Sequence, residues 1–169
     1  SILLSEFEHH SNLVPWQKIS SECGSSLKFT RMNDDYTLDI ADFDKLLDHQ
    51  TKLVAITQMS NVLGTILPIE DIISKAHSIG SLVLIDAAQS VPHMPVDVQK
   101  LNCDFLAFSG HKMLAPTGIG VLYVKPTILQ DMEPFLRGGE MVREVWFDHA
   151  TWNDAPNRFE AGTPSIADT

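Results

Sequence analysis

Three short runs of almost uninterrupted apolar residues constrain the fold of this 169-residue chain more than any other feature. They lie within residues 53–58, 82–86 and 120–124, where the sequence reads LVAITQ, LVLID and GVLYV. Such runs are typical of strands that are covered on both faces. The sequence therefore predicts strands at these positions. Weaker strand patterns occur at 1–5, 27–31 and 104–108.

Helical patterns separate the predicted strands, over residues 12–22, 41–48 and 69–79. The first would begin with Ser11 as its N-cap, and the second with Asp39, because both side chains accept hydrogen bonds from free backbone N–H groups. In the third, isoleucine and alanine recur at helical spacing and form one apolar stripe.

The alternation of strands and helices predicts an α/β fold, with a mostly parallel sheet and helices on both faces. We expect the strand at 120–124 to be antiparallel, because the connection before it is too short for a crossover. Residues 137–169 are rich in Gly, Pro, Trp and Asn, and are predicted to be loop and active-site rim.

Composition excludes several classes of function. The formal net charge of −10 argues against nucleic-acid binding, and no apolar segment is long enough to span a membrane. The two cysteines, Cys23 and Cys103, form no metal-binding spacing, so we expect neither a disulfide framework nor a zinc site, and we expect a cytoplasmic protein.

Polar side chains follow four of the predicted strands. In parallel sheets ligands bind at the carboxyl ends of the strands, so these side chains are expected to share one site. They are His9 or His10, Asn61, Asp86, Gln89, Ser109, His111 and Lys112.

The chemistry of these residues suits a pyridine aldehyde. A neutral lysine amine such as that of Lys112 condenses with an aldehyde, and the carboxylate of Asp86 would pair with a pyridinium nitrogen. The ordinary alternatives are a surface lysine and an aspartate that caps a turn. Gln89 could contact a ring oxygen, and the flat imidazole of His9 could stack on the ring.

A phosphate could bind to small polar side chains beside glycine. Ser109 and His111 flank the lysine segment, and Thr163 follows Gly162. Each of these residues is also common in ordinary turns.

The chain resembles the class V aminotransferase family of pyridoxal 5'-phosphate (PLP) enzymes, and within it the branch of cysteine desulfurases and selenocysteine lyases that supply sulfur for iron–sulfur clusters. The resemblance covers nearly the whole chain. Its segments are EHHSN at 8–12, PW at 15–16, SNVLGT at 60–65, DAAQS at 86–90, SGHKM at 109–113, PTGIGVLY at 116–123, GGEM at 138–141 and RFEAGTP at 158–164.

The resemblance implies a role for each candidate residue. Lys112 would carry the cofactor covalently and move protons, and His9 would stack on its ring. The remaining contacts would be Asp86 with the ring nitrogen, Gln89 with the ring oxygen, Asn61 near the ring and substrate carboxylate, Ser109 and His111 with the phosphate, and Thr163 with the phosphate of the partner subunit in a homodimer.

The same resemblance implies that residues 1–169 are the central part of a fold type I, PLP-binding large domain. The family's upstream phosphate-binding segment, its C-terminal small domain, and its nucleophilic cysteine and carboxylate-binding arginine are expected outside them. We expect these residues alone to bind PLP weakly and to release no sulfide.

The implied activity is conversion of the amino acid L-cysteine to L-alanine, with the sulfur passed to an acceptor protein. Alternatives are selenocysteine lyase, another class V enzyme of aminotransferase, kynureninase-like or epimerase-like type, and a non-enzymatic α/β binding module. The last is disfavoured because no Gly-x-Gly-x-x-Gly turn follows the first strand.

Overall fold

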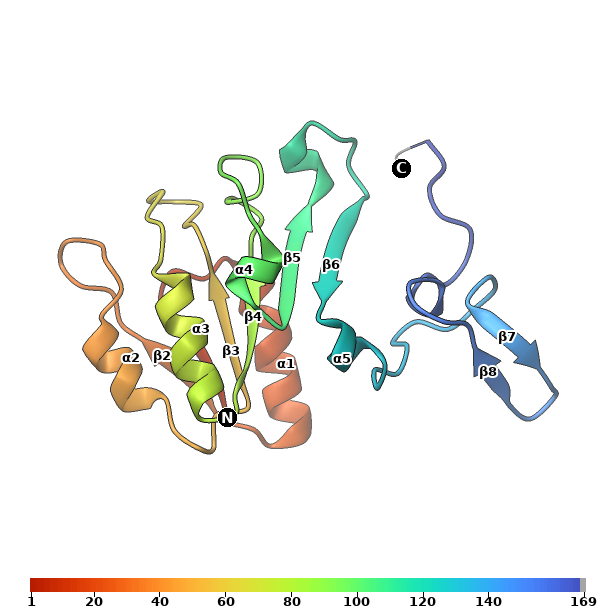
Figure 1. Cartoon of the computed structure of the whole chain (residues 1–169), viewed down its shortest axis with the longest axis horizontal. Helices are drawn as coiled ribbons and strands as arrows, with labels where there is room; N and C mark the ends of the chain where they lie inside the picture. The colour runs from red at the N-terminus through yellow and green to blue at the C-terminus, as the bar shows by residue number, and fades with distance from the viewer. Residues whose placement is uncertain (168–169) are drawn as a thin grey trace.

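The computed structural model describes residues 1–167 and shows an α/β fold built on a six-stranded sheet (Figure 1). The strand order is β2-β1-β3-β4-β5-β6. Every pair in this sheet is parallel except β5–β6, which confirms the expected antiparallel last strand. The strands are β1 (Ile2–Ser5), β2 (Leu27–Thr30), β3 (Leu53–Thr57), β4 (Leu82–Asp86), β5 (Phe105–Ser109) and β6 (Gly120–Val124).

The predicted helices are present, with one error at an N-terminus. Asp39 caps its helix as expected, and its carboxylate accepts a hydrogen bond of 2.9 Å from the Asp42 N–H. Ser11 is not a cap, because it lies inside a short 3-10 helix whose N-cap is His9. The helices are η1 (His10–Asn12), α1 (Val14–Cys23), α2 (Ile40–Leu46), α3 (Ile69–Ser78), α4 (Val98–Leu101), η2 (Gly110–Met113), α5 (Pro126–Leu129) and η3 (Asn157–Phe159).

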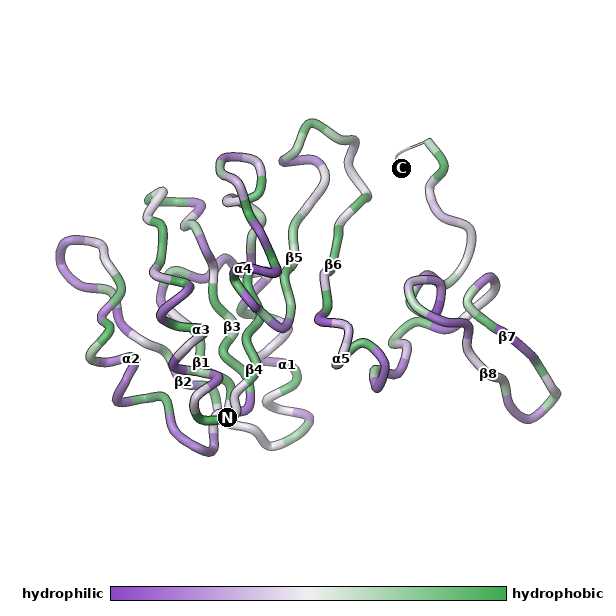
Figure 2. The backbone as a smooth tube through the Cα atoms, in the orientation of Figure 1, coloured by the Kyte–Doolittle hydropathy of each residue, from purple (hydrophilic) through white to green (hydrophobic). Residues whose placement is uncertain are grey.

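The two faces of the sheet are covered unequally. On one face, α2, α3 and α4 pack against a large core that includes Val54, Ile56 and Ile85. On the other face, Ile2, Leu4 and Ala55 form a smaller cluster, and the helix packed against it is α1. Figure 2 shows the apolar residues concentrated along the strands of this sheet. Helices therefore lie on both faces of the sheet.

The prediction of loop for residues 137–169 is partly wrong. A two-stranded antiparallel hairpin forms there, from β7 (Val142–Val145) and β8 (Ala150–Trp152), and Met141 beside it is fully buried. Residues 168 and 169 of that range lie outside the described residues. Among residues 1–167, no helix combines the length and the apolar character that a membrane crossing requires.

The core assignment predicts a stability difference between two isoleucines. Ile72 in α3 is 0% exposed, so Ile72→Ala should lower the free energy of unfolding by about 2–5 kcal/mol. Ile19 in α1 is 39% exposed, and Ile19→Ala should cost less than about 1 kcal/mol. Urea unfolding of the intact protein measures both values. Equal losses would contradict the packing of α3.

Candidate active site

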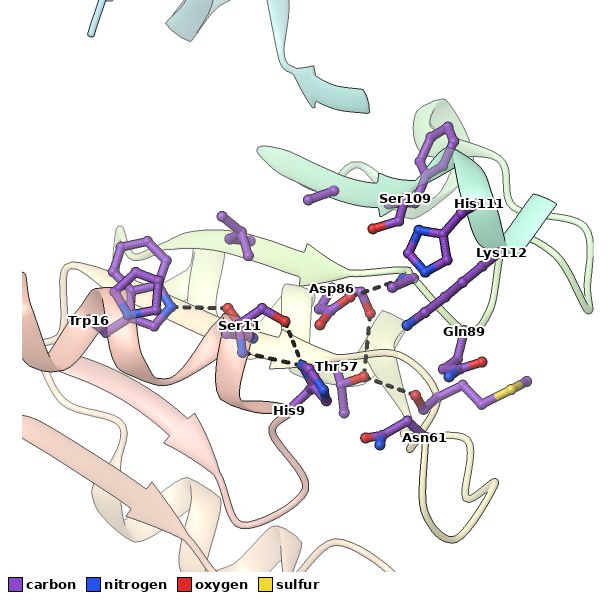
Figure 3. Close-up of a pocket in the computed structure, with 17 residues that line it drawn as sticks. His9, Ser11, Trp16, Thr57, Asn61, Asp86, Gln89, Ser109, His111 and Lys112 are labelled. Atoms are coloured by element: carbon purple, nitrogen blue, oxygen red, sulfur yellow. Dashed lines mark hydrogen bonds between the residues drawn. The ribbon is translucent and has the colours of Figure 1, made fainter. Parts of the chain in front are cut away.

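A cavity of about 530 Å³ lies at the carboxyl ends of β3, β4 and β5 (Figure 3). This volume is within the range that small-molecule and cofactor sites occupy. Thr57, Asp86 and Ser109, the last residues of these strands, all line it. Parallel pairing of β3 with β4 and of β4 with β5 brings the strand ends together at one edge of the sheet.

The alternation of side chains along a strand determines which residues face the cavity. Thr57 and Asp86 are partners in the β3–β4 register, and Asp86 and Ala107 are partners in the β4–β5 register, so all three lie on one face. Their neighbours Ile56 and Ile85 point to the opposite face and are fully buried in the large core. The apolar strands thus form both the core and the floor of the cavity.

Seven of the eight predicted site residues line this cavity, and the eighth does not. Thr163 lies in the exposed segment after η3, outside the cavity. His10, the alternative to His9, is also outside it, with its ring 5.9 Å from that of His9. The residues brought together are His9, Asn61, Asp86, Gln89, Ser109, His111 and Lys112.

Lys112 lies on η2, in the connection between the antiparallel strands β5 and β6. Its side chain points toward Asp86 and Gln89 in Figure 3. The turn depends on Gly110, where an added Cβ would lie 3.2 Å from the Ile119 carbonyl oxygen and 3.3 Å from Ala115 Cβ. A larger residue at position 110 would therefore displace the segment that holds the lysine.

Asp86 caps a turn and also faces the cavity. One carboxylate oxygen accepts a hydrogen bond of 2.9 Å from the Ala88 N–H, so Asp86 does cap the following turn. The same carboxylate also faces the cavity, across from Lys112. Capping fixes its orientation and leaves the group available to a ligand.

His9 is oriented by a local hydrogen bond. Its Nδ1 accepts from the backbone N–H of Ser11 at 3.2 Å and lies 2.5 Å from the Ser11 hydroxyl. Because Nδ1 is engaged in this turn, the ring has a fixed direction at the cavity wall. A flat side chain held in this way can stack on a planar ligand.

Glu8 is a titratable group near the site that the sequence reasoning did not single out. The residue is only partly buried, but its carboxyl group is withdrawn from water, and this burial raises its pKa to about 7. The Ser5 hydroxyl, the Asn12 side-chain amide and the Thr57 N–H all donate to it, at 2.5, 2.7 and 3.1 Å. The available signal was an acidic residue close to the end of a buried strand, and the exposed Glu6 shares that signal.

The raised pKa predicts a pH-dependent stability. Between its ordinary value of 4.5 and about 7, Glu8 holds a proton in the folded protein and loses it in the unfolded chain. The free energy of unfolding should therefore fall as the pH rises through this window, with a contribution of up to about 1.4 kcal/mol per pH unit.

Glu8→Gln cannot titrate and should lose this contribution. Glu6→Gln, two residues earlier and exposed, should keep it. Urea unfolding of the intact wild-type protein and both variants across this window measures the difference. Identical pH profiles for Glu8→Gln and wild type would contradict the raised pKa.

Known proteins resemble this chain in both sequence and structure. A probable cysteine desulfurase of Synechocystis sp. is 52% identical over 167 residues, which are 99% of this chain and 40% of that protein. A cysteine desulfurase of Escherichia coli superimposes with a TM-score of 0.96 at 44% identity, covering 99% of this chain and 42% of that one. The chain thus spans about 40% of the length of these relatives.

A more distant structural relative contains a cofactor. It is a variant of the protein C-DES with glycine covalently linked to PLP. It has a TM-score of 0.86 and 27% identity, and the match covers 96% of this chain and 44% of that one. The family model of class V aminotransferases matches residues 1–169, so this chain belongs to the class V aminotransferase family.

Proposed function

We propose that this chain forms the PLP site of a cysteine desulfurase that acts on L-cysteine. The observation that carries this proposal is the meeting of Lys112, Asp86 and Gln89 in one cavity at the carboxyl edge of the sheet. The cysteine desulfurases at about half identity to this chain support the choice of reaction.

The donor set of the cavity fits PLP. Lys112 would hold the cofactor through Nζ, Asp86 would pair with the ring nitrogen, and Gln89 would donate to the ring oxygen. Ser109 and His111, which line the cavity at the end of β5 and in η2, would bind the phosphate. His9 would stack on the ring, with Asn61 near the substrate carboxylate.

PLP, when bound, supplies an electron sink for bond cleavage at a substrate amino acid. The carboxylate of Asp86 would keep a proton on the ring nitrogen and so maintain that capacity. The amine of Lys112 would take up and return a proton at the substrate α-carbon. The hydrogen bond from the Ser11 N–H to His9 Nδ1 would hold the imidazole ring at the cavity wall.

The sulfur atom of the substrate would be transferred to a thiol that residues 1–169 do not supply. In the overall reaction, L-cysteine and a thiol give L-alanine and a persulfide, so the C–S bond breaks as an S–S bond forms. Cys103 is fully buried, and burial raises the pKa of its thiol, which disfavours the reactive thiolate. Cys23 is exposed at the end of α1, and neither cysteine lines the cavity.

We extend the proposal to the assembly and its location. A homodimer would bring Thr163, which lies outside this cavity, to the phosphate of the partner subunit. An acceptor protein would then collect the persulfide sulfur in the cytoplasm. The molecular mass in solution and the PLP affinity are measured for the intact wild-type protein and for Thr163→Ala. A dimer that persists with weaker PLP binding would assign Thr163 to the phosphate and not to dimer formation.

The first test of the function is covalent capture of PLP by Lys112. Borohydride reduction of the intact protein with PLP, followed by peptide mass mapping, should place a stable pyridoxyl group on Lys112. Lys112→Ala should abolish it, whereas Lys18→Ala, on an exposed part of α1, should not. A label on any other lysine would contradict the assignment.

The second test is the role of Asp86 in turnover. Asp86→Asn keeps the shape of the side chain but cannot stabilise a positive charge on the ring nitrogen. We expect alanine formation from cysteine to fall at least ~100-fold, or about 2.7 kcal/mol, with PLP still bound. Asp131→Asn, at an exposed position, is the matched control. Unchanged turnover in Asp86→Asn would mean that Asp86 only caps the turn. A keto-acid product from the wild-type protein in place of alanine would indicate a different class V activity.

A further inference from the structure

One wall of the cavity is built from η1 and the start of α1, and it carries His9 and Trp16. The Trp16 indole packs against the small cluster of Ile2, Leu4 and Ala55. Its Nε1–H donates a hydrogen bond of 3.0 Å to the side-chain oxygen of Asn12, which Figure 3 shows as a dashed line from the indole. The position of the indole therefore depends on which way the Asn12 amide is turned.

Glu8 determines that orientation. The Asn12 Nδ2 donates to Glu8 Oε2 at 2.7 Å, so the amide oxygen is left to face Trp16. Ser5 and Thr57 both donate to the other oxygen, Oε1. A proton on the neutral carboxyl can lie between Oε1 and Ser5, and Oε2 remains an acceptor. Glu8 thus holds Asn12 the same way in both protonation states.

The same carboxyl connects this wall to the sheet. Thr57 is the last residue of β3 and the register partner of Asp86 on β4. Its N–H donates to Glu8 at 3.1 Å, across 49 positions of sequence. The carboxyl group therefore joins the segment that carries His9 and Trp16 to the strand end beside Asp86.

We propose that Glu8 is a positioning residue for the cofactor pocket: through Asn12 it fixes the Trp16 indole in the wall, and through Thr57 it ties that wall to the floor. This inference rests on the proposed function only in that the pocket takes PLP. Glu8 does not itself line the cavity, so its effect on the cofactor is transmitted through its hydrogen-bond partners.

Glu8→Gln tests the hydrogen-bond polarity at nearly constant shape. If the new amide group points its NH₂ toward Asn12, it faces the NH₂ of Asn12, and two donors meet. Rotating the Asn12 amide removes that contact but places its NH₂ against the Trp16 N–H, so two donors meet there. If it points its NH₂ toward Thr57, it meets the backbone N–H there. Either orientation leaves one donor without an acceptor, which destabilises a buried group.

Glu8→Gln combined with Asn12→Asp restores every pairing. The carboxylate introduced at position 12 accepts from both the new amide and the Trp16 indole, while the amide oxygen at position 8 still accepts from Ser5 and Thr57. Glu6→Gln, an exposed glutamate on the same turn, is the matched control.

The first measurement is hydrogen exchange of the Trp16 indole N–H by NMR in the intact, cofactor-free protein. The resonance is assigned with Trp16→Phe, and the indoles of Trp146 and Trp152 are internal references. We expect exchange to be about tenfold faster in Glu8→Gln, and within about threefold of wild type in the combined variant. Glu6→Gln should behave as wild type.

The second measurement is PLP affinity, from titration of the cofactor-free protein. It should weaken about tenfold in Glu8→Gln and recover most of that loss in the combined variant. Unchanged indole exchange in Glu8→Gln would overturn the inference, as would a combined variant that fails to fold or to recover. Indole exchange that responds while PLP affinity does not would also overturn it. Failure of the wild-type protein to bind PLP would instead overturn the proposed function, and indole exchange would still show whether Glu8 positions Trp16.

Discussion

Parallel pairing of β1, β3, β4 and β5 is the constraint on which the site depends. Parallel strands begin at one edge of a sheet and end at the other, so residues distant in sequence arrive at the same place. The side-chain alternation then sends Ile56 and Ile85 into the core and Thr57 and Asp86 to the cavity. A shift of one residue in β3 or β4 would turn the core-facing residues of that strand toward the cavity and the cavity-facing residues toward the core. The core and the site would then both be lost.

Much of this architecture could be predicted because it is encoded in local patterns. The apolar runs are all strands, although β6 is largely exposed and not covered on both faces as expected. Helix α3 has an apolar stripe at helical spacing, and Asp39 is a cap that acts within three residues. Ser11 is not a cap because its own N–H donates to the side chain of His9, which caps a 3-10 helix that contains Ser11. The β7–β8 hairpin was missed because its short strands are largely exposed and carry no clear alternation.

The candidate site could be predicted where a residue type has its own chemistry, as for Lys112 and Asp86. It could not be predicted where the role belongs to a set of contacts. Glu8 acts through Thr57, and only the folded chain brings the loop after β1 to the end of β3. Trp16 would be an ordinary core residue by its sequence, and its place in the cavity wall depends on the Asn12 amide. The direction of a hydrogen bond between side chains produces no periodic pattern in the sequence.

The reversal of β6 also affects the order in which the sheet can assemble. In residues 1–167, β5–β6 is the pair of the main sheet that closes across a short connection, residues 110–119, whereas β3 and β4 are joined through residues 58–81. Local pairings lose less chain entropy on closure and are favoured early in folding. The hairpin that holds Lys112 therefore has the lowest contact order in the sheet, and we expect it to form before the parallel strands that surround the lysine amine in the cavity.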